Sequence, residues 1–124
     1  MKNQNHRENM VRHAMDCMGI AVTIIDAECR LLYYNERAEK ILDRKPEFIG
    51  QDVRSHHTEA SSSRKFDDMI REFKKGRTKP FHYEANPYGR FISVTFSPIV
   101  VEEKFAGAVQ TVVMKEKNTV ISDW

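Results

Sequence analysis

Tyr34-Asn35-Glu36-Arg37-Ala38-Glu39 is the stretch of this chain that decides its fold. It follows an apolar run, residues 19 to 26, and a short polar turn, residues 27 to 30. Asn35 is a residue type favoured at the N-cap of a helix, because its side-chain oxygen accepts a free backbone N–H. Glu36 then lies in the first turn, where the helix dipole favours an acid. The stretch therefore predicts two β-rich segments that meet at a tight turn, the second running into a helix.

The composition limits the classes of protein that this chain can belong to. Its 124 residues suit one domain. With 20 basic and 18 acidic residues the net charge is +2, so the composition does not indicate an extended basic surface for nucleic acid. Residues 1 to 12 are polar and lack the core of a signal peptide, and no apolar stretch has transmembrane length. We expect a cytoplasmic protein without membrane contact, in which Cys17 and Cys29, which lack CxxC spacing, stay reduced.

The N-terminal segment shows the periodicity of a helix over residues 7 to 18. Val11, Ala14, Met15 and Met18 recur at i, i+3, i+4 and i+7, so they share one face. Methionine adapts to irregular surfaces. This stripe packs either on the helix's own domain or on a second copy of the chain, and the sequence leaves both interpretations open.

The rest of the chain divides into a middle rich in helix and a final third rich in strand. A short helix follows Asn35, and a longer one before Gly76 has the strongest helical period. Serines 61 to 63 precede that period and offer caps for the longer helix. The expected strands cover residues 20–26, 30–34, 81–85, 91–99 and 105–114, the last three as an antiparallel meander.

Several short motifs in this order carry a family resemblance. Asp26 ends the first strand, Asn35 and Ala38 start a helix, and three further motifs follow: Ile49 to Val53, Ser97-Pro98 and Gly107. Together they resemble the PAS domain family, small sensor modules, over about residues 17 to 115.

The resemblance implies an α+β fold, in which a five-stranded antiparallel sheet carries helices on one face and an amphipathic helix precedes it. It divides the chain into a helical cap or dimerisation segment (residues 1–18), a PAS domain (19–115) and a C-terminal tail (116–124). Many members end with Asp-Ile-Thr, whereas this chain reads Met114-Lys115-Glu116-Lys117. No effector follows, so the chain is expected to be either a fragment of a larger regulator or a protein that acts in trans.

The resemblance also implies a sensory role in signal transduction or in the regulation of transcription. Its usual ligand site is the gap between the sheet and the long helix. The expected lining is Phe66, Met69, Ile70 and Phe73 on the helix and Val22, Ile24, Val94, Phe96, Val109 and Thr111 on the sheet. Alternatively, these side chains fill the core, and the domain serves as an interaction or dimerisation module without a cofactor.

The cofactor remains open at this level. His56 and His57 precede the long helix, and haem iron accepts an imidazole as axial ligand. The resemblance favours His57 as that ligand, and as the only metal site, if haem binds. The alternative is a solvated pair in a loop. His82 is a weaker candidate, and flavin is less expected because no Asn-Cys-Arg-Phe motif occurs.

Other features argue against catalysis and narrow the expected partners. Phosphate-binding loops, nucleophile elbows, zinc spacings and the kinase phosphoacceptor segment are missing from the sequence. Asp67 and Asp68 are adjacent on a helix, so their carboxylates splay apart. Arg54 and Arg90 are the candidates to hold a small carboxylate, although both are expected at the surface. We therefore expect no enzyme, but a homodimer through the N-terminal helix, with a regulator protein or effector domain as a further partner.

Overall fold

The sheet of this protein has five antiparallel strands in the order β2-β1-β5-β4-β3. The computed structural model describes residues 2–42, 44–56, 60–86 and 91–114. The strands are β1 (Ala21–Asp26), β2 (Leu31–Tyr34), β3 (Phe81–Ala85), β4 (Ile92–Val101) and β5 (Lys104–Met114).

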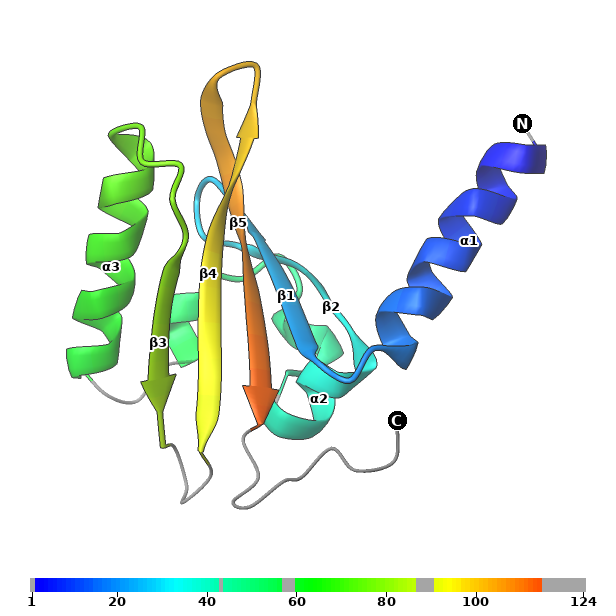
Figure 1. Cartoon of the computed structure of the whole chain (residues 1–124), viewed down its shortest axis with the longest axis horizontal. Coiled ribbons are helices and arrows are strands. Elements are labelled where there is room, and N and C mark those ends of the chain that lie inside the picture. The colour runs from blue at the N-terminus through cyan, green and yellow to red at the C-terminus, as the bar shows by residue number, and fades with distance from the viewer. Residues whose placement is uncertain (1, 43, 57–59, 87–90, 115–124) are drawn as a thin grey trace, which may run out of the picture.

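Within these described residues, three α-helices and two short 3-10 helices accompany the sheet. They are α1 (Lys2–Cys17), α2 (Glu36–Leu42), η1 (Pro46–Phe48), η2 (Val53–His56) and α3 (Ala60–Lys74). In Figure 1 the helix α1 leads away from the sheet, while the β4–β5 hairpin extends beyond the other strands of the sheet. The predicted α+β fold, with a five-stranded antiparallel sheet and an N-terminal helix, is confirmed.

The tight turn between β1 and β2 depends on the carboxylate of Asp26. One of its oxygens accepts the backbone N–H groups of Glu28 and Arg30, each at 2.9 Å. Cys29 in this turn has a φ of 66°. Burial raises the pKa of Asp26, but the hydrogen bonds from Arg30 and Glu28 outweigh burial and hold that pKa below its usual value. The acid at the end of the first strand therefore holds the hairpin.

The ends of α3 confirm one prediction and correct another. Gly76 has a φ of 110°, and the N–H groups of Gly76 and Arg77 bond back to the carbonyls of Phe73 and Glu72. This pattern ends the helix at the predicted glycine. Serines 61 to 63, expected as caps, lie inside the helix instead, because it begins at Ala60.

Two separate apolar clusters form the core. The first, here called the α3 cluster, gathers around the long helix; the second, the α2 cluster, gathers around the short one. Tyr34 packs against both. The α3 cluster consists of Ile25, Cys29, Leu31, Val53, Phe66, Met69, Ile70, Phe73, Phe96 and Ala108, and the α2 cluster of Ala21, Ala38, Ile92, Val94 and Val112.

Asn35 joins three elements through its fully buried side chain. Its oxygen accepts the N–H of Val22 at 2.9 Å and that of Ala38 at 3.0 Å. Its amide nitrogen donates to the carbonyls of Met15 at 2.7 Å and Ile20 at 2.9 Å. The predicted N-cap of α2 is confirmed, and the same side chain also holds β1 and the end of α1.

Replacing Asn35 by Ala should lower the free energy of unfolding by about 3 kcal/mol or more, because four backbone groups lose their partner in a buried place. Asn35→Asp keeps both acceptor roles but sets a buried carboxylate oxygen against the carbonyls of Met15 and Ile20, so at neutral pH it should destabilise at least as much as the alanine variant. Urea unfolding followed by circular dichroism measures both changes. Equal stability of Asn35→Ala and the wild type would contradict the role of the amide.

Gly107 lies in β5 opposite Asp26 at the end of β1. A Cβ built on this glycine would stand 2.2 Å from the carbonyl oxygen of Ile25, a backbone atom that cannot rotate away. Gly107 pairs with Asp26 on one side and with Ile99 on the other, so both neighbouring strands fix its position.

The substitution Gly107→Ala should therefore destabilise the domain by about 1 to 3 kcal/mol through overpacking. Gly19→Ala is the matched control, because a Cβ at Gly19 meets no atom within 4 Å. Urea midpoints of the two variants, compared with the wild type, provide the measurement. Similar midpoints for both variants would show that the strands move apart at little cost.

Candidate functional site

The long helix presents the predicted residues to the sheet. Phe66, Met69, Ile70 and Phe73 are all buried in the α3 cluster. The ring of Phe96 on β4 forms a T-shaped pair with that of Phe66, at 5.5 Å between centroids, and stacks on that of Phe73 at 6.2 Å. Val94 faces the same way but belongs to the α2 cluster. The placement of these side chains between sheet and helices is as expected.

Thr111 and three other predicted lining residues lie on the other face of the sheet. Thr111 is paired with Val22 and Thr95, and paired residues of antiparallel strands point to one side. Thr95 lies between Val94 and Phe96, so its side chain points away from the helices. Val22, Ile24, Val109 and Thr111 therefore do not line the space beneath α3, and their predicted placement was wrong.

The predicted histidine and arginine candidates are only partly described. His57 and Arg90 lie outside the described residues, and His56 ends η2 without a described side chain. His82 is exposed on the outer face, with its Nδ1 2.9 Å from the hydroxyl oxygen of Thr95. Arg54 lies at the surface, as expected, and is ion-paired with Asp52 and Asp67.

A polar layer lies beneath the sheet and involves a residue that the sequence analysis missed. Arg44, between α2 and η1, is half-buried, and its guanidinium reaches the inner face of the central strands. Its Nη2 donates to the side-chain oxygen of Gln110 at 3.0 Å, and its Nε lies 3.4 Å from the hydroxyl oxygen of Thr23. Thr23 and Gln110 face each other across β1 and β5.

Tyr83 extends this layer towards the edge of the sheet. Its pKa is raised by burial, and a hydrogen bond from the side chain of Gln110 offsets part of that rise. The residue is 36% exposed on the edge strand β3, so its ring links the interior with solvent. Thr23, Arg44, Gln110 and Tyr83 are here called the inner polar layer.

The charge of Arg44 is not balanced by a carboxylate among the described residues, since its side-chain partners there are a hydroxyl and an amide. Burial lowers the pKa of this guanidinium from its usual value, yet an arginine stays protonated near neutral pH. Placing an unpaired charge in an apolar interior costs free energy. The arrangement can therefore accept an anion.

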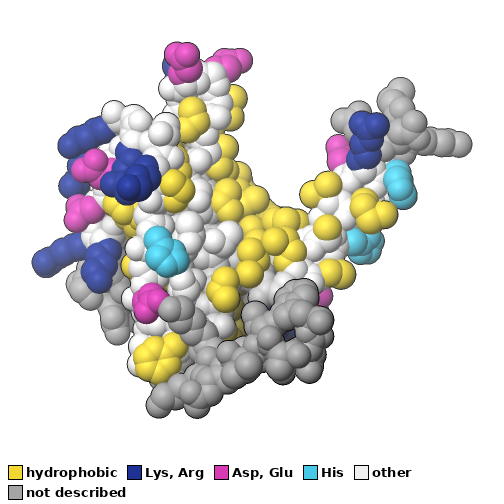
Figure 2. All heavy atoms as spheres, in the orientation of Figure 1, with side chains coloured by type: hydrophobic (Ala, Val, Ile, Leu, Met, Phe, Trp, Pro, Cys, Tyr) yellow, Lys and Arg dark blue, Asp and Glu magenta, His cyan; other side chains and the backbone are white. Residues whose placement is uncertain are grey.

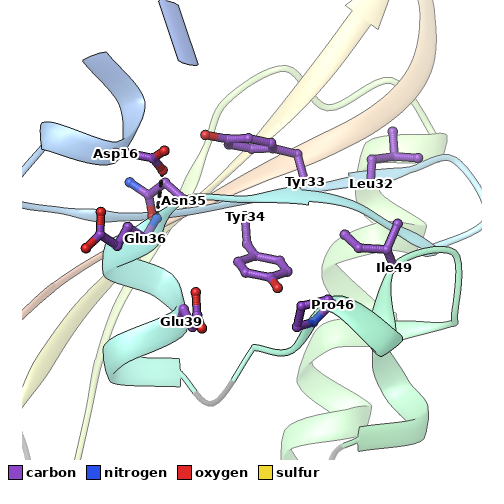
Figure 3. Close-up of a pocket in the computed structure, with 9 residues that line it drawn as sticks. All are labelled: Asp16, Leu32, Tyr33, Tyr34, Asn35, Glu36, Glu39, Pro46 and Ile49. Atoms are coloured by element: carbon purple, nitrogen blue, oxygen red, sulfur yellow. Dashed lines mark hydrogen bonds between the residues drawn. The ribbon is translucent and has the colours of Figure 1, made fainter. Parts of the chain in front are cut away.

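A depression of about 410 Å³ lies at the junction of α1, β2 and α2 (Figure 3). Tyr33 and Tyr34 point to opposite sides of β2, with Asp16, Glu36 and Glu39 around the rim. Asp16 accepts the backbone N–H of Glu36 at 2.9 Å, and Glu36 pairs with Lys40. The carboxylates of Asp16 and Glu36 therefore already have protein partners.

A second depression, of about 480 Å³, lies beside the end of α3 and is floored by Phe73 and Phe105. Within the described ranges, no group of three or more His, Cys, Asp and Glu side chains could hold a metal ion. No helix in that part of the chain is long and apolar enough to cross a membrane.

Comparisons with known proteins agree with this architecture. No curated protein matches the sequence. Among solved structures, a PAS domain from Colwellia psychrerythraea superposes with a TM-score of 0.67 at 18% identity, over 88% of this chain and 97% of that one. The PAS domain of BvgS from Bordetella pertussis gives a TM-score of 0.70 at 12% identity, over 91% and 89%.

A sensory box sensor histidine kinase from Vibrio cholerae gives a TM-score of 0.64 at 13% identity, over 94% of this chain and 98% of that one. At these identities the structures show a common fold. The family model described as PAS domain matches residues 11–114, which is most of the sequence. The chain therefore belongs to the PAS domain family.

Proposed function

We propose that this PAS domain is a sensory domain that binds a small ligand between the inner face of its sheet and the helices α2 and α3. The observation that carries the proposal is the inner polar layer, which separates the α3 cluster from the α2 cluster. Apolar side chains would fill a purely structural core at lower cost, because a buried charge must be desolvated. Arg44 and Gln110 therefore support a binding role at this place.

The position of the layer also supports a route by which binding reaches α1. Thr23 contacts Arg44, and the neighbouring Val22 donates its N–H to Asn35. Asn35 in turn holds the carbonyl of Met15 at the end of α1. A shift of β1 on binding would thus be felt at α1, which fits a role in signal transduction, such as control of a kinase or of transcription.

Ligand binding can be tested by thermal unfolding of the purified protein in the presence of a compound library that includes hemin and flavin mononucleotide. A specific ligand at about 100 times its Kd adds about 2.7 kcal/mol of stability, so the midpoint should rise by about 5 °C or more. Amide hydrogen exchange should then show protection in β1 and β5. A library without any hit, or protection confined to the outer surface, would argue against a sensor.

The samples that contain hemin distinguish a haem sensor from a sensor of other ligands. A Soret band that shifts on reduction, and that is lost in His57→Ala but kept in His82→Ala, would assign haem to His57. A featureless spectrum would restrict the search to colourless ligands.

A second role, dimerisation through α1, is supported by apolar side chains that the chain leaves exposed. Met10 and Val11 on α1 are 57% and 61% exposed, and Met18 follows the helix at 39%. Figure 2 shows hydrophobic side chains gathered on the sheet opposite α1. On the sheet, Leu32 in β2 and Val113 in β5 are also exposed. We propose that a second copy of the chain covers these surfaces across a two-fold axis.

The substitution Val11→Glu should then convert a dimer into a monomer in sedimentation velocity, because it places a charge in the apolar contact. Asn9→Glu on another face of the exposed helix is the matched control and should leave the dimer intact. A wild-type protein that sediments as a monomer at high concentration, or a Val11→Glu variant that stays dimeric, would contradict this interface.

A further inference from the structure

Arg44 differs from the ion-paired arginines of the surface, and from Arg77, which donates to the backbone carbonyls of Lys79 and Pro80. Arg30, Arg54 and Arg71 each form an ion pair with an aspartate at the surface. Arg44 lies deeper, and its contacts within the described residues are with Thr23 and Gln110. The half-buried guanidinium of Arg44 thus carries a charge for which the described part of the chain supplies no carboxylate partner.

The guanidinium also retains hydrogen-bonding capacity. A guanidinium carries five N–H donors in a planar fork that matches the two oxygens of a carboxylate. Thr23 and Gln110 engage Nε and one N–H of Nη2, so the remaining N–H groups stay available for an anion. Because both protein partners lie on the sheet, they also orient the fork beneath β1 and β5.

The surroundings of the fork restrict the rest of the ligand. Apolar clusters lie on both sides of the inner polar layer, and Tyr34 packs against both of them. A doubly charged phosphate would find one cation and little other polar surface here. A molecule with one carboxylate and an apolar body would find a partner for each part.

We propose that the ligand of this domain is an organic acid whose carboxylate pairs with Arg44 and whose apolar part lies against the α2 and α3 clusters. This inference rests on the proposed ligand-binding function and specifies the chemical class of the ligand. Gln110 positions the guanidinium and, with Tyr83, offers a further polar contact to the acid.

The test uses the full chain and a panel of straight-chain and aromatic acids, among them hexanoate, octanoate and benzoate, each beside its amide. Titration calorimetry should detect the acids and not the amides of the same shape. Arg44→Gln should weaken binding of the acids about 10- to 100-fold, the loss expected for hydrogen bonds between charged groups. Arg37→Gln on the exposed side of α2 is the matched control and should bind as the wild type does.

A second readout does not require the variant to fold. In the wild type, the side-chain Nε–H resonance of Arg44 should shift during titration with the best acid and stay in place with its amide. Equal binding of acids and amides, or unchanged acid binding by a folded Arg44→Gln, would overturn the inference while leaving a sensor for other ligands. Failure of every acid, together with failure of the wider library, would overturn the sensory proposal as well.

Discussion

The side-chain amide of Asn35 is the constraint on which the rest of the domain depends. It bonds to four backbone groups from α1, the segment before β1, β1 itself and α2, and it does so without contact with solvent. A buried amide that uses both its oxygen and its nitrogen specifies one arrangement of its partners. Although α1 stands away from the sheet in Figure 1, its last turn is fixed to the core.

The inner polar layer makes a different contribution. It prevents the core from forming one continuous apolar cluster, because Arg44, Thr23 and Gln110 lie between the α2 cluster and the α3 cluster. Such a layer reduces the stability of the free protein, and in the proposed function it provides directional contacts for the ligand. Since Val22 and Thr23 are adjacent, the bonds to Asn35 and to the polar layer meet on one short strand.

Much of the fold follows from local patterns in the sequence. The strands, the meander, the stripe Phe66, Met69, Ile70 and Phe73, and the stop at Gly76 each depend on neighbours within a few residues. Which face a strand buries is harder to infer where both faces are apolar. In β5 the apolar pairs Ala108-Val109 and Val112-Val113 flank Gln110 and Thr111, so the pattern does not alternate and gave no sign that Thr111 points outward.

The site was harder to predict than the fold. Arg44 is followed by Lys45 and Pro46 and reads as part of a solvated loop, whereas its burial results from partners 21 and 66 residues away. The hydrogen bonds that the side-chain nitrogen of Asn35 donates could not be predicted for the same reason, since the carbonyl groups that accept them lie 15 and 20 residues earlier. Only the N-cap role, which spans three residues, could be inferred from the motif.

The division of the core has a consequence for motion. Two clusters that share few side chains can open separately, because loosening one does not empty the other. In the proposed ligand binding, the α3 cluster would loosen while Ala38, Val94 and Val112 keep α2 on the sheet. Asn35, which caps α2 and bonds to the carbonyl of Met15, attaches α1 to the α2 side of the domain, so opening of the α3 side would leave that attachment intact.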